Sequence, residues 1–148
     1  MIDDTLSALA AGLGAVLRER SLMLATAESC TGGWVGQAVT AVSGSSDWYD
    51  RGFITYSNAA KQEMLGVSPD TIERHGAVSE QTAREMAVGA LTHSRAQLAL
   101  AITGVAGPLG GTAHNPVGTV CFAWAMRARD AAAADASGTV APAAATAR

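Results

Sequence analysis

The sequence predicts a single α/β domain built as a three-layer α/β/α sandwich. Segments with helical spacing of apolar residues alternate with short apolar runs of strand length, a pattern typical of helices packed on both faces of a sheet. Glycine-rich turns follow two of these runs. At 148 residues, the chain can bury roughly two-thirds of its unfolded surface in one core.

The chain begins with an amphipathic helix over about residues 6–17, with two aspartates before it and two arginines near its end, as the helix dipole favours. The apolar run 22–25 is too short for a helix and predicts a strand. Helical spacing returns over 34–42. These elements form the first strand-to-helix unit.

The remaining elements follow the same alternation. Residues 52–56 are expected to form a strand and 59–65 a short helix. Ser79 should cap a helix that continues to Leu91. Strands are then predicted at 98–103 and 117–126.

The carboxy-terminal segment has a different composition. Residues 127–148 contain 11 alanines, and Gly138 and Pro142 interrupt any helix. We therefore expect a domain over residues 1–126 and a disordered or irregular tail over 127–148. Apolar surface and a sheet edge exposed at this end would be covered by the tail or by a partner such as a second copy in a homodimer, or would stay open.

Two candidate nucleophiles, Ser29 and Cys30, lie beside paired glycines where the first strand turns into the second helix. The first amides of a helix carry partial positive charge and can hold phosphate or a developing oxyanion. Gly32 and Gly33 would let a ligand approach closely. The alternative is a plain turn in which Thr31 caps the helix. Position alone does not choose between the hydroxyl and the thiol.

A second cluster offers a base. Lys61 lies in the first turn of the helix after the 52–56 strand, where the dipole and partial burial would lower its pKa. A neutral lysine can accept the proton of a serine, and Tyr56 could bind or relay that proton. The alternative is a solvated lysine and an ordinary half-buried tyrosine.

The loop from Thr103 to Gly111 contains four glycines and follows an apolar strand. Backbone donors in such a loop would lie at the carboxyl edge of the sheet, where open α/β folds bind ligands. The loop matches neither the Walker nor the dinucleotide pattern, so a flexible connection is the alternative.

Composition excludes several classes. A net charge of −3 disfavours a nucleic-acid surface, and no apolar run approaches the length of a membrane span. The three histidines lack the spacing of a zinc site, so no metal is expected. Two cysteines do not suggest a disulfide framework, and the cytoplasm is the expected location.

Together these segments resemble the carboxy-terminal domain of the competence/damage-inducible protein CinA and its stand-alone relatives, the bacterial nicotinamide-nucleotide amidases. The resemblance runs from about Leu6 to Met126. Its matches are AESCTGGW at 27–34, GSSDWYDRGFITYSNAAKQEMLGV at 44–67, HGAVSE at 75–80, GVAGPLGG at 104–111 and PVGTV at 116–120. The chain departs from the family at its end, where relatives continue with another strand, a GDR-containing turn and a long helix.

The resemblance implies that the chain hydrolyses nicotinamide mononucleotide to nicotinic acid mononucleotide and ammonia, in pyridine nucleotide recycling and without a cofactor. It implies Ser29 as the nucleophile, favoured over Cys30, with Tyr56 and Lys61 activating it. The residues expected to bind substrate are Thr31, Gly32, Gly33, Asn58, Thr103, Gly104, Gly107 and Gly111. Two alternatives stay open: a non-catalytic partner in competence or DNA damage, and an amidase for another small amide.

Overall fold

The computed structural model describes residues 3–128 and 143–147. Its strands are β1 (Leu24–Glu28), β2 (Tyr49–Ile54), β3 (Leu98–Gly104), β4 (Val120–Met126) and β5 (Ala143–Ala147). Its helices are α1 (Asp4–Glu19), α2 (Trp34–Thr40), α3 (Asn58–Leu65), α4 (Pro69–His75) and α5 (Glu80–Thr92), with a 3₁₀ turn, η1 (Ser45–Asp47).

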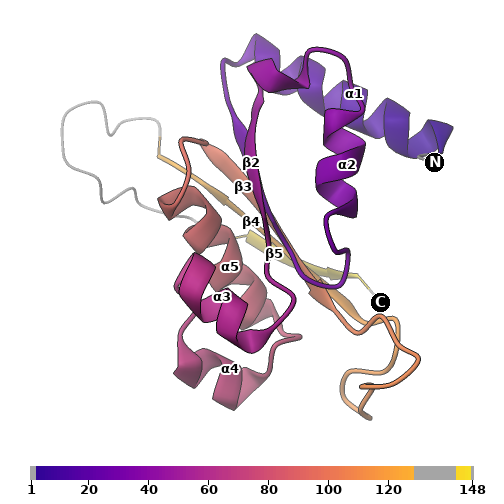
Figure 1. The fold of residues 1–148 in the computed structure, drawn as a ribbon, viewed down its shortest axis with the longest axis vertical. Coiled ribbons are helices and arrows are strands. Elements are labelled where there is room, and N and C mark those ends of the chain that lie inside the picture. The colour runs from indigo at the N-terminus through magenta and orange to yellow at the C-terminus, as the bar shows by residue number, and fades with distance from the viewer. Residues whose placement is uncertain (1–2, 129–142, 148) are drawn as a thin grey trace.

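These elements form a three-layer α/β/α domain, which confirms the predicted fold class (Figure 1). The sheet has the strand order β2-β1-β3-β4-β5. Strands β1, β2 and β3 are parallel, whereas β4 pairs with both of its neighbours in the antiparallel sense. Helices α1 and α2 cover one face, and α3, α4 and α5 cover the other. No helix in the described ranges is both long and apolar enough to span a bilayer.

Small side chains bring the layers close together. On the α5 face, alternate strand positions in β1, β3 and β4 are mostly alanines with no exposed surface, which pack against α5. On the other face, Trp48 is fully buried beneath α1. A Cβ on Gly14 would lie 2.5 Å from the indole ring, so α1 can cover Trp48 only because position 14 has no side chain.

The parallel strands differ from their predicted bounds. β1 runs through Glu28, beyond the expected 22–25, and β2 ends at Ile54, before Tyr56. Thr26 and Glu28 are polar but buried, so polarity did not mark the end of the strand. Helix α4 was not predicted, because a seven-residue segment after Ser68 carries little helical periodicity.

The expectation of a disordered or irregular tail is wrong for Ala143–Ala147, which form β5 against β4. The free edge of β4 offers unpaired backbone groups to any extended segment, a tertiary effect that tail composition does not reveal. The tail therefore covers this sheet edge. The rest of the predicted tail, 129–142 and 148, lies outside the described residues.

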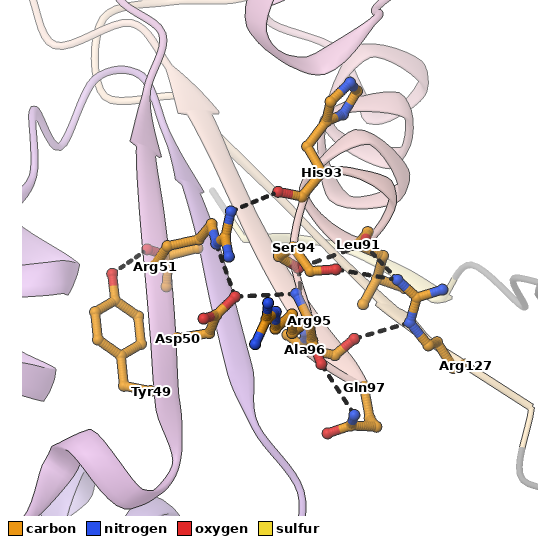
Figure 2. Close-up of polar contacts among 11 residues, drawn as sticks. Tyr49, Asp50, Arg51, Leu91, His93, Ser94, Arg95, Ala96, Gln97 and Arg127 are labelled. Carbon is orange, nitrogen blue, oxygen red and sulfur yellow. Dashed lines mark hydrogen bonds and ion pairs between the residues drawn. The ribbon is translucent and has the colours of Figure 1, made fainter. Parts of the chain in front are cut away.

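A polar cluster lies at the end of the sheet where the parallel strands begin (Figure 2). The Arg127 guanidinium donates to the carbonyl oxygens of Leu91, Ser94 and Ala96. Asp50 accepts from the Arg95 amide at 3.0 Å and pairs with Arg51 at 2.8 Å. We call the residues Asp50, Arg51, Arg95 and Arg127 the amino-end cluster.

Candidate active site

Ser29 lies directly after β1, the middle of the three parallel strands, at their carboxyl edge. Its amide donates to the Ile102 carbonyl at 3.0 Å, while the Thr55 amide donates to the carbonyl of Glu28 at 2.8 Å. Both neighbouring strands thus fix the backbone around the serine. This edge is where open α/β sheets place their ligands.

Lys61 reaches Ser29 from α3. Ser57 caps this helix by accepting the Ala60 amide at 3.0 Å, which sets the start of the helix and the direction of Lys61. Lys61 is only 2% exposed. Its Nζ donates to Ser29 Oγ at 3.0 Å and to the Thr55 carbonyl at 2.7 Å. The predicted proximity of Ser29 and Lys61 is therefore present in the fold.

The position of α3 depends on a close approach to α5. A Cβ on Gly89 would lie 2.0 Å from the Leu65 carbonyl oxygen, well inside any permitted contact. The two helices therefore meet backbone to backbone at this point. Lys61 is carried by a helix that rests directly on its neighbour.

Burial lowers the pKa of Lys61, because the charged ammonium loses solvation. Among the described residues, no carboxylate lies within ion-pair distance of its amine. A neutral amine can donate to the Thr55 carbonyl and still offer its lone pair to the Ser29 hydroxyl. The geometry and the direction of the pKa shift both suit a general base.

Cys30 is the weaker candidate nucleophile. Burial raises the pKa of its thiol, which favours the less reactive protonated form. A Cβ on Gly104 would lie 2.9 Å from the Cys30 sulfur, so the thiol packs closely against β3. Its environment is that of a packed thiol, whereas Ser29 contacts the Lys61 amine.

Two predicted oxyanion donors are already occupied, which corrects the expectation for this turn. The Gly32 amide donates to the Ser29 carbonyl at 3.0 Å, and the Gly33 amide donates to Glu28 Oε1 at 3.2 Å. The amides of Cys30 and Thr31 lower the pKa of the Cys30 thiol, and neither amide donates to a backbone oxygen within residues 3–128.

The alternative interpretation of Thr31 as a helix cap is also wrong. Its hydroxyl donates to Glu28 Oε1 at 2.6 Å, and the residue at the helix cap is Gly33, which has no side chain. Sequence reasoning missed Glu28, which is 2% exposed, and the Thr55 carbonyl. An acidic residue shortly before a helix start was an available signal for Glu28.

Tyr56 does not join the Ser29–Lys61 pair in this structure. It is 70% exposed, and its hydroxyl makes no hydrogen bond within the described part of the chain. Asn58 is exposed at the first position of α3. The predicted roles of both residues remain predictions.

Only the first residues of the Thr103–Gly111 loop lie near the Ser29–Lys61 pair. Thr103 is buried, and its hydroxyl donates to the Ala77 carbonyl at 2.8 Å. Gly104 packs against Cys30, whereas Gly107 and Gly111 pack against Val117 farther along the loop. In Figure 1 this orange loop projects beyond the end of the sheet. Whether these residues bind substrate remains a prediction.

A pocket of about 650 Å³ opens next to β4, and none of residues 29–34 lines it. Its lining residues are Arg74, His75, Val78, Ser79, Glu80, Gln81, His114, Asn115, Thr119 and Cys121. Cys121 pairs with Thr103, and β3 lies next to β1. Since side chains alternate along a strand, Thr103 and Cys121 share the α5 face with Ser29. The pocket and the Ser29–Lys61 pair therefore lie on the same face.

Comparison with known proteins agrees with this architecture. Nicotinamide-nucleotide amidohydrolase PncC of Escherichia coli K12 is 52% identical over 125 residues, which are 84% of this chain and 76% of that protein. A putative competence-damage inducible protein of Symbiobacterium thermophilum is 55% identical over 79% of this chain and 28% of its own length. The crystal structure of competence/damage inducible protein CihA from Agrobacterium tumefaciens superposes with a TM-score of 0.85 and 45% identity, covering 97% of this chain and 82% of that one. The profile of the CinA C-terminal domain matches residues 6–140, and the chain therefore belongs to the CinA C-terminal domain family.

Proposed function

We propose that this chain hydrolyses the carboxamide of nicotinamide mononucleotide to nicotinic acid mononucleotide and ammonia, as a step in pyridine nucleotide recycling. The observation that carries the proposal is the 3.0 Å contact between Lys61 Nζ and Ser29 Oγ. The 52% identity to a nicotinamide-nucleotide amidohydrolase supports the substrate.

The reaction divides into two steps. Neutral Lys61 takes the Ser29 proton as Oγ attacks the amide carbon, and the Cys30 and Thr31 amides stabilise the developing oxyanion. The C–N bond then breaks, and ammonia leaves with the proton from Lys61. Water hydrolyses the resulting ester with Lys61 again as the base, which releases the acid and restores Ser29.

The pocket can take the remainder of the nucleotide. It begins two strands from Ser29, roughly 10 Å at the usual strand spacing, a span that suits a ribose and its phosphate. Arg74, which also pairs with Asp70 at 3.0 Å, brings a cationic side chain to its wall, and His75 and His114 bring imidazole nitrogens. A guanidinium is a good partner for a phosphate.

Ammonia release from nicotinamide mononucleotide tests the proposal. Ser29→Ala should lower kcat by at least roughly 1000-fold, because nothing else in the turn replaces the nucleophile. Cys30→Ala should retain far more activity, since its thiol is protonated and packed. Ser46→Ala, an exposed serine on η1, is the matched control and should behave like the native chain.

Equal release from the native chain and Ser29→Ala would exclude the proposed nucleophile. No release from nicotinamide mononucleotide, with release from another small amide, would keep the chemistry and replace the substrate. No release from any amide would favour a non-catalytic partner role.

A further inference from the structure

Glu28 is a buried carboxylate that the proposed mechanism does not use. It ends β1 immediately before Ser29 and is 2% exposed. Burying a charged carboxylate is costly unless donors surround it. Its surroundings should therefore show what it does.

Both carboxylate oxygens are directed at the start of α2. Oε1 accepts from the Thr31 hydroxyl at 2.6 Å, the Gly33 amide at 3.2 Å and the Val35 amide at 2.9 Å. Oε2 accepts from the Gly36 amide at 3.0 Å. A Cβ on Gly36 would lie 3.5 Å from Oε2, so the carboxylate packs closely against the helix backbone. Four donors satisfy the carboxylate and fix it to the turn.

These contacts span the nucleophile. Glu28 precedes Ser29, and all four of its donors follow Ser29 in the chain. The Glu28 side chain thus links the residue before Ser29 to the residues after it. The Glu28 backbone is itself fixed, because its carbonyl accepts the Thr55 amide and the Thr55 carbonyl accepts the Lys61 amine.

The same carboxylate decides which amides can meet a substrate. It occupies the helix amides that would otherwise attract an anion, whereas the amides of Cys30 and Thr31 donate to no carboxylate or backbone oxygen in the described residues. A substrate oxygen is thereby directed to the two amides nearest Ser29.

We infer that Glu28 is a positioning residue, which rests on the proposed function: its carboxylate closes the nucleophile turn so that Ser29 faces Lys61 and the Cys30 and Thr31 amides face the substrate carbonyl. Glu28 touches neither substrate nor proton. It acts through the turn that it holds.

The test compares Glu28→Gln with a matched control. Glu85 on α5 also accepts a backbone amide and a threonine hydroxyl at a helix start, from Ser68 at 2.7 Å and from Thr71. These hydrogen bonds hold the start of α4, and no hydrogen bond joins Glu85 to the Ser29 turn within the described residues. Glu85→Gln therefore makes the same chemical change at a second helix start.

Glu28→Gln should lower kcat on the order of 100-fold with little change in KM, since small misplacement of a reacting group costs about that much. Glu85→Gln should lose a similar amount of thermal stability and keep kcat within about twofold of the native value. Any change in its KM would come from Arg74 and His75 on α4, which line the pocket. The pH at which activity rises should stay unchanged in both variants, because neither carboxylate contacts Lys61. Equal loss of kcat in both variants, or native kcat in Glu28→Gln, would overturn the inference.

A second measurement does not depend on the substrate. A fluorophosphonate probe reacts with activated serines, and its rate of labelling Ser29 should fall in Glu28→Gln and not in Glu85→Gln. Labelling of the native chain without ammonia release from nicotinamide mononucleotide would reject the proposed substrate and leave this comparison decisive. If Glu28→Gln does not fold, Thr31→Val removes one donor to the carboxylate, and native labelling and kcat in that variant would refute the role of Glu28.

Discussion

The carboxyl edge of the sheet and the amino-end cluster both gather charged side chains, but they differ in what those side chains contact. In the amino-end cluster, the Arg127 guanidinium donates hydrogen bonds to three carbonyl oxygens (Figure 2). Asp50 accepts hydrogen bonds from the Arg95 amide and the Arg51 side chain. At the carboxyl edge, Lys61 has no carboxylate partner in the described residues and contacts a hydroxyl.

The difference shows what separates a reactive site from a structural one in this fold. In the amino-end cluster, Asp50 and Arg127 are partly buried and have hydrogen-bond partners, so they join neighbouring elements. The Lys61 amine at the carboxyl edge is buried, which lowers its pKa, and it has no carboxylate partner among the described residues. The number of polar groups would not distinguish the two regions, whereas their partners do.

The largest effect that separates the two regions should come from Lys61→Met. Loss of the proposed general base should lower kcat/KM by roughly 100- to 10,000-fold. The free energy of unfolding should stay level or rise, because an apolar side chain of similar length replaces a buried amine without a counter-charge. Ammonia release and urea denaturation measure the two quantities, and a strongly destabilised variant would show that Lys61 is structural.

The pH dependence of the same variant sharpens this result. The folded pKa of Lys61 lies below its unfolded value of 10.5, so between the two values the unfolded chain binds more protons. The free energy of unfolding of the native chain should therefore rise as pH increases through this window. Lys61→Met should lack this rise. Native kcat/KM should rise as pH passes the lowered pKa, since only the neutral amine accepts a proton. A profile that falls over that range would contradict the assignment.

Arg127→Met should give the opposite result at the amino end. Loss of the guanidinium leaves three carbonyl oxygens without this donor and should lower the free energy of unfolding by about 1–3 kcal/mol. Below the unfolding temperature, kcat should stay within about twofold of the native value, because Arg127 lies at the other end of β4 from the nucleophile. A large fall in kcat at full folding would mean that the two regions are coupled.

Tyr56→Phe should have the smallest effect. The hydroxyl is exposed and makes no hydrogen bond to Ser29 or Lys61, so kcat should fall less than about tenfold. Steady-state kinetics on nicotinamide mononucleotide measure the change. A loss as large as that of Lys61→Met would show that substrate binding brings Tyr56 into the proton path.

Local sequence patterns were sufficient to predict much of the fold and the proximity of Ser29 and Lys61. The periodicity of apolar residues identified α1, α5 and the core strands, and the position of Ser29 after a strand placed it at the functional edge. Lys61 was predictable because Ser57 and Asn58 mark a helix start close to the preceding strand. Each of these inferences depends on residues that are near one another in sequence.

The features that the sequence did not predict depend on contacts made in the folded structure. Composition alone suggested irregular structure for Ala143–Ala147, whereas the free edge of β4 makes them a strand. The Gly32 and Gly33 amides looked available for an oxyanion until the Glu28 carboxylate and the Ser29 carbonyl were found to accept them. Which acceptor a backbone donor finds is settled by the folded turn, and spacing in the sequence does not reveal it.

The absence of a side chain at Gly89 limits which substitutions α5 can tolerate at its contact with α3. Because Leu65 rests on it directly, any added methyl group must move α3 outward, and the amine moves with the helix. Proton transfer depends steeply on the separation of donor and acceptor, so the reaction is sensitive to the size of a residue that carries no functional group. Substitutions that abolish activity should thus include some at the contact between α3 and α5, although no residue at this contact takes part in the chemistry.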